Sequence, residues 1–280
     1  MRLSRAWGAY SYSLAAIVWA GTVMAAIAFG FVSSLHHAIW ILAMPHHAMA
    51  PLWLWAVVGV SGIMLVVLWY RIIAAMMRSQ IQRRHLLELI GPYLRPFPSS
   101  VPGPLAEVAD WFMVDDHDER YAFTWGLGRG RVAISRSLWQ ALDESARTAV
   151  MYHEAAHALA RDPFQQALLQ ILSEAFKPLG MGSLYRRYLV QREIYADQTA
   201  VRAFQGDDLP LLTALKAAVE SAPSLPSHVG LAGALEARIQ FLTTQQPMAW
   251  SDMRLRFRFY ASGLAVLVTI AEGILVWCHW

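Results

Sequence analysis

Long apolar runs separated by polar stretches are the main feature of this chain. Residues 14–32 and 52–70 contain no charged side chain, and residues 259–277 contain a single one, Glu272. A helix needs about 20 apolar residues to cross the hydrocarbon core of a bilayer. The pattern therefore predicts three transmembrane helices, so that the lipid bilayer is one partner of this protein.

The first apolar run could also be a signal peptide, because basic residues, Arg2 and Arg5, precede it as they precede the apolar core of a signal peptide. It is longer than the roughly 7–15 residues of a signal-peptide core, and no clear cleavage site follows it. We expect a membrane anchor at residues 14–32.

The arginines predict the orientation of the spans. Arg2 and Arg5 precede the first span, several arginines follow the second and precede the third, and residues 33–51 contain neither Lys nor Arg. Basic residues collect on the cytoplasmic side of a membrane protein. We expect the N-terminus and residues 71–258 in the cytoplasm, and the loop 33–51 and the C-terminus outside.

Two features of the membrane part stay open at this point. The loop 33–51 carries His36, His37, His46 and His47, which suit a pH-sensitive or metal-binding role as well as an ordinary solvated loop. Glu272 is costly in lipid and either faces the helix bundle or lies near the outer interface.

Composition excludes several classes of protein. Hydrophobic residues make up 56% of the chain and charged residues 15%, which excludes a disordered chain. A single cysteine excludes an internal disulfide framework and a cysteine-rich zinc site. The net charge of +3 reflects arginines at the membrane borders, so we expect no direct binding of nucleic acid.

A polar region follows the second span. The helical pattern continues to Ile90 and is stopped by Gly91-Pro92, and five prolines between 92 and 104 predict a stiff, extended connector. We therefore divide the chain into a membrane region (1–77), a juxtamembrane helix and linker (78–104), a cytoplasmic domain (105–250) and the last span (259–277).

The cytoplasmic domain combines a few strands with several helices. Residues 111–114 are typical of a strand, and the apolar runs at 121–125 and 132–134 flank a Gly-rich turn and predict a hairpin. The fold class is mainly α, with three transmembrane helices and a cytoplasmic α+β domain. We expect helices over residues 143–161 (with Asp143 as N-cap and Asp162-Pro163 as terminator), 164–176, 185–204, 209–221 and 231–245.

The helix over 143–161 contains the motif His153-Glu154-Ala155-Ala156-His157. Histidines at i and i+4 project from one helical face, so both imidazoles can bind one zinc ion. Glu154 lies near enough to take a proton from a zinc-activated water molecule. Two histidines buried on a helix face are the alternative interpretation.

A third ligand is expected downstream, because catalytic zinc takes three protein ligands. Glu193 and Asp197 lie at i and i+4 on one predicted helix. Glu193 would complete the ligand set, and Asp197 could accept the free ring N–H of a ligand histidine and fix its tautomer. Solvated charges paired with Arg192 are the alternative. Asp162 is interpreted as a helix-ending residue and not as part of the site.

The chain from Phe123 to Ala200 resembles the integral-membrane zinc metallopeptidases of the BlaR/MecR antirepressor type, which are gluzincins. The resemblance is specific at the zinc motifs and looser over roughly residues 80–245. HtpX and CAAX-prenyl proteases share these motifs, but HtpX-type enzymes have two spans between the zinc motif and the third ligand, and none occurs here. The matching segments are 122–124, 132–135, 152–157, 161–163, Arg192-Glu193 and Ala196-Asp197.

The resemblance implies one Zn²⁺ bound by His153, His157 and Glu193, with Glu154 as general base. It adds His228, in a segment followed by Arg238-Ile239, as a candidate for stabilising the oxyanion; Tyr195 is its rival. It also implies a bacterial cytoplasmic membrane and a cytoplasmic protein substrate, such as a transcriptional repressor of the BlaI/MecI type.

The chain departs from that family at its end. The receptors carry a penicillin-binding sensor domain after the last span, where this chain has three residues. We therefore expect the protease half without β-lactam sensing. Two alternatives stay open: a quality-control or processing protease of the HtpX or CAAX-prenyl kind, and a receptor or scaffold that has the fold without turnover. The sequence gives no oligomeric state.

Overall fold

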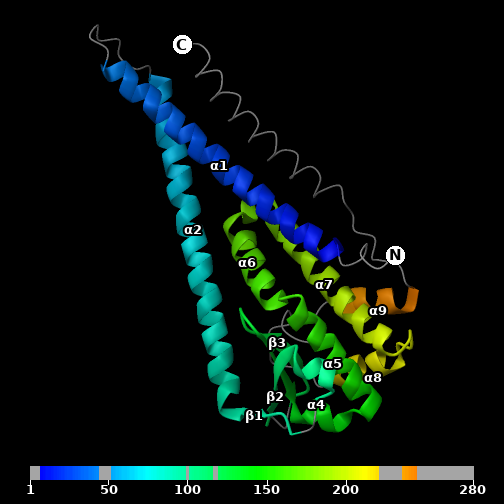
Figure 1. Ribbon diagram of the computed structural model, residues 1–280. Coiled ribbons are helices and arrows are strands. Elements are labelled where there is room, and N and C mark those ends of the chain that lie inside the picture. Colours follow the sequence, from blue (N-terminus) through cyan, green and yellow to red (C-terminus); the bar gives the residue numbers. More distant parts are fainter. Residues whose placement is uncertain (1–6, 44–51, 99–100, 116–118, 221–234, 245–280) are drawn as a thin grey trace. The chain divides into compact units, whose positions relative to one another are not determined.

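A computed structural model describes residues 7–43, 52–98, 101–115, 119–220 and 235–244 (Figure 1). The described chain is mostly helical, with one small sheet. The predicted span 259–277, His228, the pair His46 and His47, and Glu272 lie outside the described residues.

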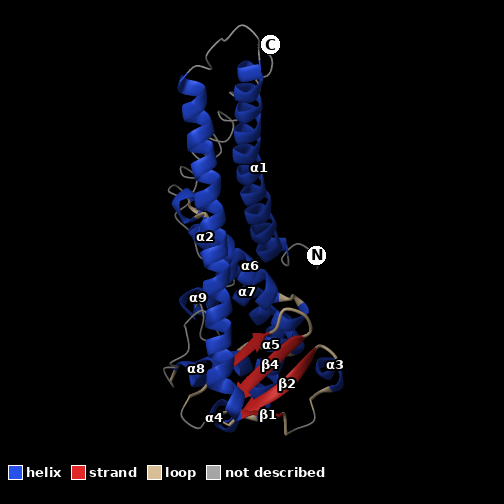
Figure 2. Cartoon of the chain, turned by 90° about the vertical axis from the view of Figure 1, so that its left-hand side faces the viewer, coloured by secondary structure: helices blue, strands red, loops and turns tan. Residues whose placement is uncertain are grey.

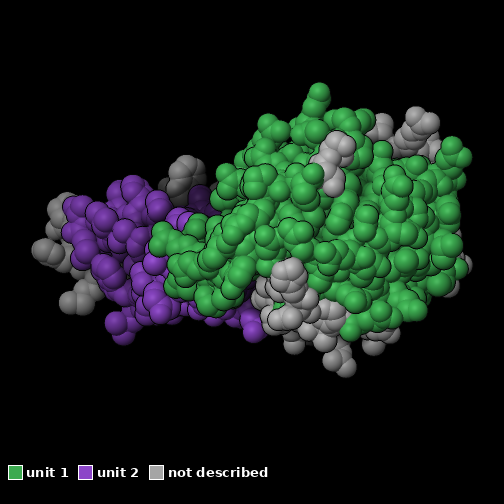
Figure 3. Space-filling model, turned by 90° about the horizontal axis from the view of Figure 1, so that it is seen from below, with its two compact units in different colours: residues 1–13, 79–168, 185–250 green, residues 14–78, 169–184, 251–280 purple. Residues whose placement is uncertain are grey.

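The chain divides into two compact units (Figure 3). We call the purple one the long-helix unit; it includes residues 14–43, 52–78 and 169–184. The green one, the sheet unit, includes residues 79–98, 101–115, 119–168 and 185–220 together with 235–244.

The long-helix unit contains most of α1 (Trp7–Ala43) and the first part of α2 (Leu52–Ile90). Tyr12–Ala43 and Leu52–Tyr93 are each long and apolar enough to cross a membrane, and only 22% and 11% of their most apolar windows are buried. A core helix of a soluble protein would be mostly buried, so exposed apolar side chains of this extent are consistent with a membrane protein.

Helix α1 is longer than the predicted first span. The outer loop was predicted to begin at residue 33, and this start was wrong, because α1 continues to Ala43 and includes His36 and His37. Residues 33–43 contain neither Gly nor Pro, so nothing in them interrupts the helix. Helix α2 ends at Ile90, before Gly91-Pro92, as the sequence predicts.

Arginines of α2 bind the end of α6 (Asp162–Ala175) within the long-helix unit. Arg71 Nε donates to the Ala175 carbonyl at 2.8 Å, and its NH2 group donates to the Glu174 carbonyl at 2.7 Å. Arg78 pairs with the Glu174 carboxylate at 2.8 Å. The two Arg71 bonds satisfy carbonyls that the last turn of a helix leaves without partners.

The sheet unit is built on four strands in the order β1-β2-β4-β3 (Figure 2). Strands β2 and β4 are parallel, whereas β1 pairs antiparallel with β2 and β3 antiparallel with β4. The predicted hairpin is therefore confirmed as β3 and β4. The strands are β1 (Leu94–Pro96), β2 (Ala109–Val114), β3 (Ala122–Trp125) and β4 (Gly130–Ser135).

Strand β1 corrects the expectation that residues 92–104 only connect. Leu94 pairs with Val114 and Pro96 with Phe112 at the edge of the sheet. An edge strand tolerates proline, because its outer side donates no ladder hydrogen bond. The short helix α3 (Gly103–Ala106) follows.

The sheet is covered on both faces. On one face Val132 and Ile134 pack in a core with Val150 and Ala155 of α5 (Glu144–Leu159). Side chains alternate between the two faces of a strand. On the other face of the sheet, Ile90 of α2 packs with Val114, Phe123 and Ala133. The remaining helices are α4 (Arg136–Ala141), α7 (Met181–Ala203), α8 (Leu209–Val219) and α9 (Leu235–Thr244).

One predicted helix boundary was wrong. Asp143 caps α5 by accepting from the Ala146 N–H, as expected, but α5 ends at Leu159. Asp162 and Pro163 begin α6 and do not terminate α5. Proline is favoured in the first turn of a helix, where its missing N–H would have no partner.

Candidate metal centre

Helix α5 presents His153 and His157 on one face, four positions apart. Both side chains are buried, and His153 is fully so. Their Nε2 atoms lie 3.2 Å apart. Two nitrogens bound to one tetrahedral zinc ion at 2.0–2.1 Å would be separated by about 3.3 Å, so this spacing fits a shared metal.

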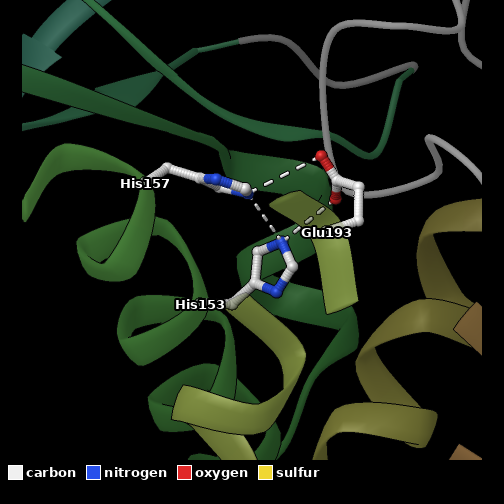
Figure 4. A group of neighbouring side chains, drawn as sticks. All are labelled: His153, His157 and Glu193. Atoms are coloured by element: carbon white, nitrogen blue, oxygen red, sulfur yellow. Dashed lines mark hydrogen bonds and ion pairs between the residues drawn. The ribbon is translucent and has the colours of Figure 1, made fainter. Parts of the chain in front are cut away.

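Glu193 of α7 faces the two histidines (Figure 4). Its Oε2 lies 3.5 Å from His153 Nε2, and its Oε1 lies 3.8 Å from His157 Nε2. Ligand atoms of the three residues all lie within 4.8 Å of one another. This group, which we call the triad, brings together the three ligands expected from the sequence.

A carboxylate lies beside the outer nitrogen of each ring. His157 Nδ1 lies 2.6 Å from Asp162 Oδ2, and His153 Nδ1 lies 3.0 Å from Asp197 Oδ1. A ring that donates from Nδ1 keeps the lone pair of Nε2 free for a metal. The structure thus places Asp197 where the sequence led us to expect it.

The interpretation of Asp162 as a mere helix terminator was wrong. Its carboxylate is buried, and it also accepts from the Tyr188 hydroxyl at 3.4 Å. An Asp-Pro pair commonly follows the end of a helix, which is why Asp162 was interpreted in that way. The turn between α5 and α6 instead brings its side chain to His157.

Two buried arginines hold the carboxylates of α7. Arg238 of α9 binds Asp197 through Nε at 2.8 Å and NH2 at 2.5 Å. Arg192 donates to Glu193 Oε1 at 2.7 Å and also to the side-chain oxygen of Gln166. From the sequence, Arg192 was expected only as a surface ion-pair partner, and no contact was expected for Arg238.

These contacts set the protonation of the site. Burial lowers the pKa of His153, but the carboxylates of Asp197 and Glu193 outweigh it and raise the value to about 9. Burial also raises the pKa of both carboxyl groups. The nearby charges overcome this effect, chiefly His157 and Arg192 at Glu193 and Arg238 at Asp197, so both pKa values are lowered. Both carboxylates are therefore ionised at neutral pH.

The charge of the cluster fits a divalent cation. Four buried carboxylates face only two buried guanidinium groups, which leaves two negative charges when the histidines are neutral. Glu193 Oε2 is buried and has no hydrogen-bond partner among the described residues. Once both histidines are neutral, with Nδ1 directed at the carboxylates, the facing Nε2 atoms offer two lone pairs to one ion. A divalent ion at the triad would satisfy all three features.

Glu154 follows His153 on α5 and is also buried. Its Oε2 accepts a hydrogen bond from the Thr124 hydroxyl of β3 at 2.7 Å. Thr124 is 30 positions away in the chain, and no local pattern in the sequence indicated its contact with Glu154.

The two oxyanion candidates are not brought to the triad by the described structure. Tyr195 is half-buried, and residues two apart on a helix project about 200° apart, so it lies on a different side of α7 from Glu193. Among the described residues, no hydrogen bond joins its hydroxyl to the triad. His228 lies outside them.

Comparison with known proteins finds a family match over part of the chain. Residues 100–188 match the model of peptidase family M48. No curated protein matches the chain. The matched segment contains His153, Glu154 and His157 and ends before Glu193, which the structure brings to them. The family match, the triad and the two long apolar helices together support a membrane-type zincin metallopeptidase.

Proposed function

We propose that this protein is a membrane-anchored zinc endopeptidase that cleaves a cytoplasmic protein. The observation that carries the proposal is the triad His153, His157 and Glu193, with the Nδ1 atoms of both rings facing carboxylates. Metallopeptidases of this kind typically use zinc, and two nitrogens and one carboxylate are a common ligand set of catalytic zinc.

Each residue has one task in this mechanism. A zinc ion held by the triad supplies Lewis acidity that activates water and polarises the scissile carbonyl. Glu154 accepts a proton from the attacking water and then delivers it to the leaving amine. Asp162 and Asp197 hold the histidine rings in the tautomer that leaves Nε2 free.

Strand β3 offers a place for an extended substrate. It is the last strand of the sheet, and its outer edge has no partner strand among the described residues. Such an edge binds a peptide by adding a strand to the sheet. Thr124 of β3 contacts Glu154, so a peptide on this edge would lie beside the general base.

The arginine distribution supports a cytoplasmic site. Arg71, Arg78, Arg83 and Arg84 follow the apolar part of α2, and basic residues favour the cytoplasmic side. We therefore propose a bacterial cytoplasmic membrane and a cytoplasmic substrate, for which a repressor of the BlaI/MecI type is the first candidate. The second candidate is a misfolded or tagged membrane protein.

The experiment compares wild type with Glu154→Gln in membranes to which a purified winged-helix repressor of the BlaI/MecI type is added. We expect the wild type to cleave the repressor and the variant to retain zinc without cleaving it. Cleavage of membrane proteins with an intact repressor would favour the quality-control alternative. A zinc-loaded wild type that cleaves neither class would favour the scaffold alternative.

A further inference from the structure

Thr124 occupies an unusual place in the sheet unit. It lies on the edge strand β3, and its side chain points to the face that is covered by α5. Alternation along the strand puts it on the same face as Ala122, which packs in the core formed with α5. Its hydroxyl lies 2.7 Å from Glu154 Oε2 and 3.1 Å from the Glu154 carbonyl.

This contact is the one side-chain hydrogen bond that the Glu154 carboxylate makes within the described part of the chain. A hydroxyl has one proton to donate, and the shorter distance assigns it to the carboxylate. Glu154 is 1% exposed. A buried carboxylate held by one donor has its rotamer fixed by that donor, and the other oxygen stays free to accept a proton.

The register of β3 adds a second property. The Ser135 N–H donates to the Tyr121 carbonyl, so these two residues form a hydrogen-bonded pair of the β3–β4 ladder. Hydrogen-bonded pairs alternate along an antiparallel ladder. Thr124, opposite Val132, therefore directs its N–H and C=O away from β4 and toward the open edge.

We infer that Thr124 is a positioning residue: its hydroxyl fixes the Glu154 carboxylate while its backbone amide group receives the substrate strand. The inference rests on the proposed peptidase function. Thr124 then sets the distance between the scissile bond and the general base, because its backbone binds the substrate and its hydroxyl binds the Glu154 carboxylate. Geometry of this kind controls turnover steeply, since a displacement of about 1 Å can cost about a hundredfold in rate.

The test uses the full chain in detergent micelles, zinc-loaded, with an internally quenched peptide that the wild type cleaves, taken from a randomised library. Thr124→Val keeps the β-branched shape and removes the hydroxyl, Thr124→Ala removes it without adding apolar bulk, and Thr124→Ser keeps it. Thr148→Val is the matched control, because the Thr148 hydroxyl donates to the Glu144 carbonyl on an exposed part of α5 and makes no other hydrogen bond within the described residues.

We expect Thr124→Val and Thr124→Ala to lower kcat about tenfold to a hundredfold, with KM and zinc content unchanged. Thr124→Ser should retain most of the turnover, and Thr148→Val should match the wild type. Wild-type kcat in Thr124→Val and Thr124→Ala, an equal loss in Thr124→Ser, or a loss that parallels zinc content would overturn the inference.

A second readout does not depend on turnover. If the hydroxyl binds the carboxylate, Thr124→Val lowers the melting temperature of the wild type more than that of a Glu154→Ala protein. Equal shifts in the two backgrounds would contradict the contact. A wild type that binds zinc but cleaves no peptide in the library would instead contradict the proposed function.

Discussion

His157 Nδ1 lies 2.6 Å from Asp162 Oδ2, although the two residues belong to different helices. The chain turns between them at Arg161, whose φ of 53° lies in the left-handed region. This conformation is unfavourable for a residue with a side chain, and such strain is commonly stored at functional sites. The turn between α5 and α6 is therefore part of the metal centre.

Removing the Asp162 charge should weaken zinc binding. In Asp162→Asn the amide is a poorer acceptor for the His157 ring N–H, and loss of such a partner typically costs 10–100-fold in metal affinity or activity, so we expect about that loss. Competition with a chromophoric chelator measures the affinity. Asp208→Asn is the control, because the Asp208 side chain makes no capping bond. Equal affinities in the two variants would contradict the role of Asp162.

Removing Arg238 should destabilise the sheet unit. Arg238→Met leaves the buried Asp197 carboxylate without its bidentate partner, and breaking a buried pair costs about 3–5 kcal/mol of folding free energy. Arg238→Lys should recover part of the loss, because an ammonium group cannot bind both oxygens in the same way. Thermal melting should rank wild type above Arg238→Lys and Arg238→Lys above Arg238→Met. An Arg238→Met protein that melts at the wild-type temperature would be inconsistent with the pairing of Arg238 and Asp197.

Zinc uptake should release protons. The pKa of His153 in the zinc-free protein is raised from 6.5 to about 9, so the ring is protonated at neutral pH and zinc must displace that proton. Apparent zinc affinity should therefore rise with pH up to about 9. Titration of zinc into weakly buffered protein at about pH 7.5 measures the release; an affinity that stays flat between pH 6.5 and 9 would contradict the raised value.

The same shift affects the stability of the zinc-free protein. Because the folded pKa of His153 lies above the unfolded value, its contribution is fully present below pH 6.5 and is lost as the pH rises through about 9. Melting temperatures of chelator-treated protein should fall across this window. His153→Gln should lose this part of the pH dependence.

Gly130 should be intolerant of a side chain. A Cβ at Gly130 would lie 2.6 Å from the Ala158 Cβ, so β4 and α5 must separate in Gly130→Ala. Overpacking of this kind costs about 1–3 kcal/mol. Ala158→Gly in the same chain should restore most of the melting temperature. Gly128→Ala serves as the control, because its Cβ would meet nothing within 4 Å.

Local patterns predicted most of the fold. The hairpin of β3 and β4 follows from two apolar runs around a Gly-rich turn, and Gly126 adopts a φ of +106° there. The triad follows from the i and i+4 spacing of its histidines together with one downstream glutamate. The hairpin and the histidine spacing depend on neighbours along the chain, whereas Glu193 was identified because it lies four positions from Asp197 on one predicted helix.

Contacts between distant segments were harder to predict. Thr124 meets Glu154 only because strand β3 packs against α5, and Arg238 meets Asp197 across 41 positions. Neither residue type indicates its partner, since a threonine in a strand and an arginine in a helix are ordinary. Asp162 was missed for another reason: the Asp-Pro pair was interpreted as the end of α5, whereas it begins α6, and that interpretation concealed the contact with His157.

The most direct test of the account compares purified wild type and Glu154→Gln for zinc content and for cleavage of an internally quenched peptide library. We predict one zinc ion per chain in both proteins, cleavage by the wild type, and a loss of at least about a hundredfold in the variant, since general base catalysis contributes that much. Cleavage by Glu154→Gln at the wild-type rate, or a wild type that binds no zinc, would contradict the central claim.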